Sequence, residues 1–367
     1  MKNIRRFLLC LLSLPFMVSV SCGDGNTGVS SGDGKGEDGL PFDEPLEQTF
    51  NYCPSVIEEE DGTRYVFYCS TAVSGVIQDH IFCRKGTRRE NGSYEWSEKT
   101  LVLAPRYFSE YFDAFHCCDP CVIKGDFLYN GQRYRYLMAY TGNTSSVNNK
   151  VGIAVSDSLM EGWIALEEPL ITYSGDPSHW GVGQPTLLSA DKKGEVLLVY
   201  SVGGNSTYNV VERWDFSDLN DPVRLSSDKV TEKGLTSLNG GLDYLSNTDI
   251  AFDEKTSRFY VVSDCHPNPT DGEPFFVGSH FRVTYLSEKE ETLGASLAQS
   301  GGRSWMSLAT VGPAETGFPR NSNCAIVRDP YGRVGGDEIE VFYSMSRTGD
   351  GYAWTYRIYA YKIPVRE

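Results

Sequence analysis

The sequence predicts an all-β protein, a five-bladed β-propeller of four-stranded antiparallel blades. Apolar runs that follow a polar residue or a cysteine, often with a proline between, recur five times along the chain. Aromatic residues make up 13% of the chain, glycine is frequent, and long amphipathic runs of helical period are absent. This composition is typical of many short strands joined by turns.

The repeats are recognised by the residues that open them. These are Cys53, Asp119, Gln184, Asp249 and Cys324. The first four starts follow one another at intervals of about 65 residues, and the last interval is longer. Because equivalent strands of a propeller meet at its axis, we expect these five side chains to surround one axial end.

Each start leads through a polar turn into a second apolar strand. The second strands are expected at 65–70, 134–140, 196–201, 259–263 and 339–344. The last repeat has only three evident strands, so residues 46–50 are expected to supply its fourth strand and to close the ring. A β-sandwich is the main rival fold, but it has no reason to repeat at this interval.

The N-terminal residues predict export. Lys2, Arg5 and Arg6 precede an apolar run that ends shortly before Cys22, which is the layout of a signal peptide over residues 1–21. Cys22 resembles the lipidated cysteine of bacterial lipoproteins, although cleavage nearby by an ordinary peptidase is the alternative. Residues 22–45, rich in Gly, Asp and Ser, are expected to be a tether, and residues 46–367 the propeller. This organisation predicts a lipid-anchored protein of the outer membrane, on its periplasmic or its surface side.

The net charge of −16 argues against nucleic acid as a partner and against membrane contact other than through the lipid anchor. An acidic chain that is rich in aromatic residues suits a neutral ligand. Carbohydrate is therefore the expected partner.

Three stretches carry a resemblance to a known family. They are Asp119-Pro120, the phrase 151–159 with Trp163, and Gly183-Gln184-Pro185. In their order and blade positions they resemble the five-bladed propeller glycosidases of glycoside hydrolase family 43 and its relatives, which act on arabinosides and xylosides. The resemblance implies an axial site with an Asp base in the first blade, a second Asp in the second blade and a Glu acid in the third.

The sequence departs from the implied set, because the matching positions hold Cys53, Asp119 and Gln184. Hydrolysis of a glycoside requires one group that protonates the leaving oxygen and another that activates water or attacks. Two interpretations follow: a glycoside hydrolase whose other groups come from loops, which we favour, or a noncatalytic glycan-binding propeller. A propeller that binds proteins is a third, weaker alternative.

The candidate catalytic residues are Asp119, Asp249 and Asp79. Asp119 and Asp249 are expected beside the axis, where two acids that face one ligand acquire different pKa values. The alternative for Asp249 is a structural aspartate that accepts backbone hydrogen bonds in a turn. Asp79 and His80 form either an acid/base pair or an ordinary loop pair.

Further side chains are expected to bind the substrate through polar contacts or ring stacking: Cys53, His80, His116, Trp180, Gln184, Arg320 and Asn323. Trp180 offers a platform for a sugar ring, with packing against a neighbouring blade as the alternative. Arg320 and Asn323 offer hydrogen bonds to hydroxyl or carboxylate groups.

The chain has ten cysteines, of which Cys10 lies in the signal peptide and Cys22 at the anchor. Export permits disulfides, and the other eight are compatible with bridges whose connectivity the sequence does not give. For Cys117, Cys118 and Cys121, buried thiols or one disulfide are expected. His116, Cys117, Cys118 and Cys121 resemble a metal cluster by spacing, but a strand would turn their side chains to opposite faces. No metal and no cofactor are expected.

Overall fold

The structure is a computed structural model that describes residues 48–365. The predictions for the signal peptide, Cys22, the tether and the first residues of the expected closing strand fall outside the described residues. Among residues 48–365, no helix is long and apolar enough to cross a membrane.

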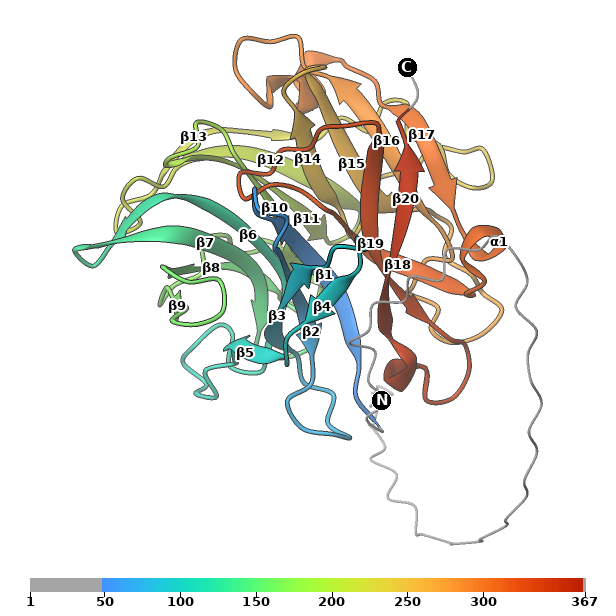
Figure 1. Cartoon of the computed structure of the whole chain (residues 1–367), viewed down its shortest axis with the longest axis horizontal. Coiled ribbons are helices and arrows are strands. Elements are labelled where there is room, and N and C mark those ends of the chain that lie inside the picture. The colour runs from blue at the N-terminus through green and yellow to red at the C-terminus, as the bar shows by residue number, and fades with distance from the viewer. Residues whose placement is uncertain (1–47, 366–367) are drawn as a thin grey trace, which may run out of the picture. The chain divides into compact units, whose positions relative to one another are not determined.

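The described chain forms five antiparallel sheets, arranged as the blades of a propeller (Figure 1). The first blade contains β1 (Asn51–Glu58), β2 (Arg64–Ser70), β3 (His80–Arg88), β4 (Tyr94–Trp96) and β5 (Thr100–Leu103), which also pairs with β3. The second contains β6 (His116–Tyr129), β7 (Gln132–Asn143), β8 (Lys150–Ser156) and β9 (Ile164–Ala165). The third contains β10 (Gly181–Ser189), β11 (Glu195–Gly203), β12 (Thr207–Asp215) and β13 (Val223–Lys229).

The fourth blade contains β14 (Asp249–Asp253), β15 (Arg258–Asp264), β16 (Phe281–Ser287) and β17 (Met306–Val311). The fifth contains β18 (Arg320–Ile326), β19 (Glu338–Ser346) and β20 (Arg357–Pro364). Four short helical segments lie in loops: η1 (Ala295–Leu297), η2 (Gln299–Gly301), α1 (Pro313–Thr316) and η3 (Tyr352–Thr355). The predicted fold class and blade count are confirmed.

The fifth blade differs from the prediction, because its sheet has three strands among the described residues. Thr49 and Phe50 form no strand. The backbone N–H of Asn51 instead donates a single hydrogen bond to the carbonyl of Tyr356 at 3.1 Å, and the ring of Phe50 lies 6.2 Å from that of Trp354. The first and last blades therefore meet at this end through an aromatic cluster rather than an added strand.

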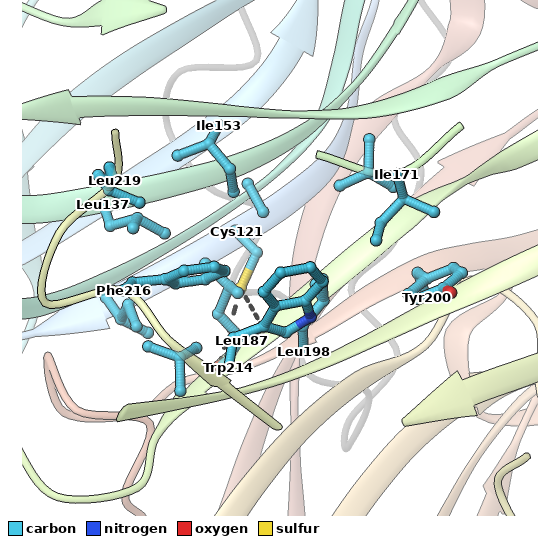
Figure 2. Close-up of a cluster of buried hydrophobic side chains, with 14 of the residues drawn as sticks. Cys121, Leu137, Ile153, Ile171, Leu187, Leu198, Tyr200, Trp214, Phe216 and Leu219 are labelled. Atoms are coloured by element: carbon cyan, nitrogen blue, oxygen red, sulfur yellow. Dashed lines mark hydrogen bonds between the residues drawn. The ribbon is translucent and has the colours of Figure 1, made fainter. Parts of the chain in front are cut away.

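The core consists of apolar side chains that fill the space between neighbouring blades. Figure 2 shows the largest cluster, in which residues of the second blade face residues of the third. Cys121 lies within it, and its sulfur accepts a hydrogen bond from the backbone N–H of Leu187 at 3.0 Å. Burial of this surface requires both blades, which explains why a single repeat cannot fold by itself.

Candidate functional site

Five residues in the left-handed region of backbone conformation surround the axis at one end. We call them the axial ring: Cys53, Asp119, Gln184, Asn247 and Asn323, with φ between 47° and 53°. In blades one, two, three and five a β-bulge coincides with this residue. A bulge turns the affected side chain away from the sheet, so four strands that start alike each present one polar side chain to the axis.

The axial ring is hydrogen bonded to itself. The Cys53 thiol donates to Oδ1 of Asp119 at 2.9 Å, and Nδ2 of Asn323 lies 3.5 Å from the Cys53 sulfur. The same Nδ2 donates to Oδ1 of Asn247 at 3.1 Å, and Oδ1 of Asn247 also accepts from Nε2 of Gln184. The five side chains therefore form a connected floor that spans all five blades.

A cavity of about 550 Å³ opens above this floor. Its walls come from inner-strand starts and from the loops beside them. Besides Asp119, Gln184, Asn247 and Asn323 of the axial ring, the lining includes Tyr52, Asp79, His116, Asn143, Asn149, Trp180, Phe276 and Tyr356. We call this cavity the axial pocket. Its volume is in the range of small-molecule sites.

Asp119 lies at the base of the axial pocket, and burial raises the pKa of its carboxyl group. Hydrogen bonds from Cys53 and Thr141 favour the ionised form and oppose this shift, but burial outweighs them. The Thr141 hydroxyl also accepts the backbone N–H of Gln184 at 2.8 Å. Asp119 therefore retains its proton to higher pH than an exposed aspartate does.

Asp79 lines the same pocket and belongs to a separate polar group. Its Oδ2 lies 2.8 Å from Nδ1 of His116, and its Oδ1 accepts from the Tyr52 hydroxyl at 3.1 Å. The backbone N–H of Asp79 also points at Nδ1 of His116 at 2.9 Å. Because Nδ1 can donate to the carboxylate or accept from the backbone, but not both, the His116 tautomer decides which bond forms.

Asp264 is a site residue that the sequence analysis missed. It ends β15, is buried, and accepts from Nδ2 of Asn247 at 2.6 Å and from the backbone N–H of Asn323 at 3.1 Å. Burial raises the pKa of its carboxyl group to about 7. The signal in the sequence was its position at the end of the second strand of blade four, where that strand reaches the axial ring.

Asp264 is expected to make the stability of the protein depend on pH. An aspartate in the unfolded chain ionises near pH 3.8, whereas Asp264 in the folded chain ionises near pH 7. Between these values the folded state holds a proton that the unfolded state has released, so this group's contribution to stability falls as the pH rises. The slope is at most about 1.4 kcal/mol per pH unit.

Asp264→Asn should remove this slope, which urea unfolding between pH 4 and 7.5 would measure. The comparison uses the slope rather than the stability itself, because Asn in place of Asp also changes the hydrogen bonds to Asn247 and Asn323. Asp126→Asn, at an exposed carboxylate paired with Arg133, is the control and should retain the slope. An unchanged slope in Asp264→Asn would contradict the assignment.

One disulfide, between Cys69 and Cys118, lies beside the axial ring. This outcome confirms one of the two alternatives for the cysteines. Cys117 and Cys121 are buried free thiols. The cluster suggested by the spacing of residues 116–121 is dispersed because alternate side chains of β6 point to opposite faces.

Comparisons with known proteins concern the whole propeller. No family model matches the chain, and no curated protein sequence does. Among solved structures, a thermostable family-43 glycoside hydrolase is similar with a TM-score of 0.54 and 14% identity, over 88% of this chain and 93% of that one. The alpha-L-arabinofuranosidase from Lactobacillus brevis gives a TM-score of 0.53 and 10% identity, over 88% and 92%.

This chain has the five-bladed propeller fold of the family-43 glycoside hydrolases. An N-acetylgalactosamine deacetylase from F. plautii is also similar, with a TM-score of 0.53 and 14% identity over 86% of this chain and 90% of that one. Since similar propellers carry different activities, the reaction has to be argued from the residues of the axial pocket.

The backbone conformations of this structure lead to two corrections of the predicted ring. In blade four Asn247 occupies the axial ring in place of Asp249, and in blade five Asn323 occupies it in place of Cys324. Asp249 instead lines a narrow cavity of about 30 Å³ below the ring. The sequence misplaces the axial residue in blades four and five because these blades lack the proline that marks the other three starts.

Both carboxylate oxygens of Asp249 are engaged by other groups of the protein. Oδ1 accepts from the Thr186 hydroxyl at 2.6 Å and lies 3.2 Å from the Arg328 guanidinium, and Oδ2 accepts from the backbone N–H of Ile326 at 2.9 Å. These contacts tie blades three, four and five together. They favour the structural alternative for Asp249 over a catalytic role.

Two predicted substrate-binding residues lie away from the axial pocket. His80 is buried, with its ring nitrogens 3.1 Å from the carbonyl of Gln78 and 2.7 Å from the Tyr107 hydroxyl. Arg320 is buried and donates to the carbonyls of Gly272 and Pro274. Arg320 thereby holds the loop that carries Phe276 into the pocket wall, so it acts on the pocket indirectly.

The other predicted binding residues do meet at the pocket. His116, Trp180, Gln184 and Asn323 line it, and Cys53 lines the narrow cavity immediately below. The ring of Trp180 lies over two glycines of the third blade: an added Cβ at Gly203 would approach it to 2.9 Å, and one at Gly183 to 3.0 Å. Glycine at these positions therefore makes room for the indole at the pocket wall.

Proposed function

We propose that this protein is a carbohydrate-active envelope lipoprotein whose axial pocket hydrolyses arabinoside- or xyloside-type glycans. One observation carries the proposal: two carboxylates in different surroundings, Asp119 and Asp79, face the same pocket. Such a pair is what glycoside hydrolysis requires. The family-43-like fold and the arabinofuranosidase among the similar structures support the substrate class.

Asp119 is the proton donor in this proposal. Burial raises the pKa of its carboxyl group and so favours the protonated form, which can donate to the oxygen of the leaving sugar. Asp79, paired with His116, takes the proton of the attacking water. The Tyr52 hydroxyl donates to Asp79 and so orients the carboxylate.

The pocket suits a neutral sugar. No Lys or Arg lines it among the residues that the structure describes, and aromatic rings of Tyr52, Trp180, Phe276 and Tyr356 do. Sugars place their apolar faces on such rings, while their hydroxyl groups bond to the amides of the axial ring. A uronic acid or a sulfated sugar would find no cation there and would meet Asp79 and Asp119.

Noncatalytic glycan binding is the second candidate, and the self-bonded axial ring favours it. The amide side chains of Gln184, Asn247 and Asn323 do not act as acids or bases near neutral pH. Burial raises the pKa of the Cys53 thiol well above its usual value. Four of the five axial positions, all except Asp119, are therefore suited to binding alone.

A panel of plant and host glycans separates the two candidates, with released sugar and bound glycan measured independently. Hydrolysis predicts released arabinose or xylose, and binding alone predicts retention without release. Trp180→Ala should weaken binding in either case, because it removes the platform at the pocket wall. Trp96→Ala, on the outer strand β4 of the first blade, is the matched control.

Membrane anchoring gives a further prediction. Cys22→Ala should abolish lipidation and release the protein from the membrane fraction, measured by fractionation and by incorporation of labelled fatty acid. Cys10→Ala, within the signal peptide, is the matched control and should remain anchored. Equal membrane retention of both variants would contradict the lipoprotein assignment.

A further inference from the structure

Three cysteine sulfurs and one carboxylate meet at the base of the axial pocket. Sγ of Cys53, Sγ of Cys69 and a carboxylate oxygen of Asp119 all lie within 4.8 Å of one another. Sγ of Cys118 lies 3.3 Å from Oδ1 of Asp119. The four residues come from three strands, β1, β2 and β6, and are brought together only by the fold.

Two of the three sulfurs also lie beside a polar hydrogen donor. The backbone N–H of Asp119 points at Sγ of Cys69 at 3.0 Å, and Nδ2 of Asn323 points at Sγ of Cys53 at 3.5 Å. Sγ of Cys118 instead lies 3.1 Å from the oxygen of the Tyr52 hydroxyl, whose proton is donated to Asp79. Donors of this kind surround the thiolates of metal sites, where they orient the ligands and stabilise their charge.

The spacing of these sulfur and oxygen atoms also suits a cation with tetrahedral coordination. Zinc binds thiolate at about 2.3 Å and carboxylate at about 2.0–2.2 Å, so two thiolates on one zinc lie roughly 3.7 Å apart. The sulfurs of Cys53 and Cys69 and a carboxylate oxygen of Asp119 lie within 4.8 Å of one another, which is close to these separations. Thiolate ligands select thiophilic ions such as Zn²⁺ over Mg²⁺ or Ca²⁺.

We propose that the chain with the Cys69–Cys118 disulfide reduced binds a thiophilic divalent cation through Cys53, Cys69, Cys118 and Asp119. Reduction by two thiol molecules converts the disulfide into two cysteine thiols and leaves one disulfide of the reductant. Binding of Zn²⁺ then releases the three protons of the cysteine thiols to solvent, together with the proton of Asp119 where that carboxyl group is protonated. The oxidised chain lacks two of the four ligands and does not form the site.

The inference does not depend on the proposed hydrolysis, since it concerns metal binding alone. The two meet only at Asp119, whose carboxylate serves either as a ligand or as a proton donor. A metal-loaded chain is therefore expected to be inactive on any glycan that the oxidised chain cleaves.

Cobalt substitution tests the proposal on the full chain. The protein is reduced, freed of reductant without air, and titrated with Co²⁺, which absorbs in the near ultraviolet when bound by thiolates. We expect one Co²⁺ per chain, displaced by Zn²⁺, and no such absorption from the oxidised chain. Cys53→Ser and Cys118→Ser should each weaken binding on the order of 10-fold or more.

The matched control is Cys83→Ser, because Cys83 is a buried free thiol of the first blade outside the pocket. It should bind as the unaltered chain does. The proposal is overturned if the reduced chain binds no Co²⁺, if it loses its folded circular dichroism spectrum, or if the oxidised chain binds equally well. Equal losses in Cys83→Ser and Cys53→Ser would also overturn it. If Cys53→Ser does not fold, Cys118→Ser and Asp119→Asn decide the question.

Discussion

Replacing Asp119 with Asn is expected to reduce glycoside hydrolysis by about 10²–10⁴-fold while the protein remains folded. The substitution removes the only titratable carboxyl group of the axial ring at nearly constant volume. Burial raises the pKa of this group against the opposing hydrogen bond from the Cys53 thiol, which favours protonation of the carboxyl group at the base of the pocket. The measurement is turnover of an arabinoside or xyloside found in the glycan panel.

One control variant and one further pocket variant accompany this measurement. Asp126→Asn, at an exposed carboxylate on the second blade, should leave turnover unchanged. Asp79→Asn should also lower turnover, because it removes the partner of His116 in the same pocket. Full activity in Asp119→Asn would place the chemistry elsewhere and would refute the axial site.

Asp249→Asn is expected to destabilise the protein by about 3–5 kcal/mol, because it removes one partner of a buried ion pair. Arg328 is 2% exposed and lies 3.2 Å from Oδ1 of Asp249. In the variant the Arg328 guanidinium would stay buried without the carboxylate that pairs with it. Urea unfolding at pH 7 measures the loss.

The same variant distinguishes the structural role of Asp249 from the catalytic one. A structural aspartate predicts lower stability and normal turnover at temperatures where the variant remains folded. A catalytic aspartate predicts the opposite pattern, with turnover lost and stability retained. Asp126→Asn serves again as the control, and its stability should change by less than about 0.5 kcal/mol.

The sequence repeat predicted three of the five axial-ring residues. A polar residue or a cysteine before proline marks Cys53, Asp119 and Gln184, and all three lie in the axial ring. Proline has no backbone N–H to give to the strand ladder, which a bulge accommodates, so it marks the bulged start in three blades. Blade five forms the same bulge at Asn323 without a proline. A local signal of this kind is readable from sequence.

Blades four and five lack that proline, and there the sequence interpretation was off by one or two residues. A shift of one position in a strand turns a side chain to the opposite face. Such a shift exchanged Asn323 for Cys324 in blade five, and in blade four the start was placed two residues late, at Asp249 rather than Asn247. The left-handed conformations of Asn247 and Asn323, visible only in the structure, correct both positions.

By itself, the sequence determined the all-β class, the five blades and the three axial residues that precede proline. It did so because periodic strands and proline-marked turns are local properties of the chain. Only the tertiary structure decided which side chains meet. Asp264 reaches the axial ring from the end of a second strand, Asp249 is held by Arg328 from another blade, and Cys69 pairs with Cys118 across 49 residues. Such contacts depend on how the blades close around the axis, and no local pattern records that closure.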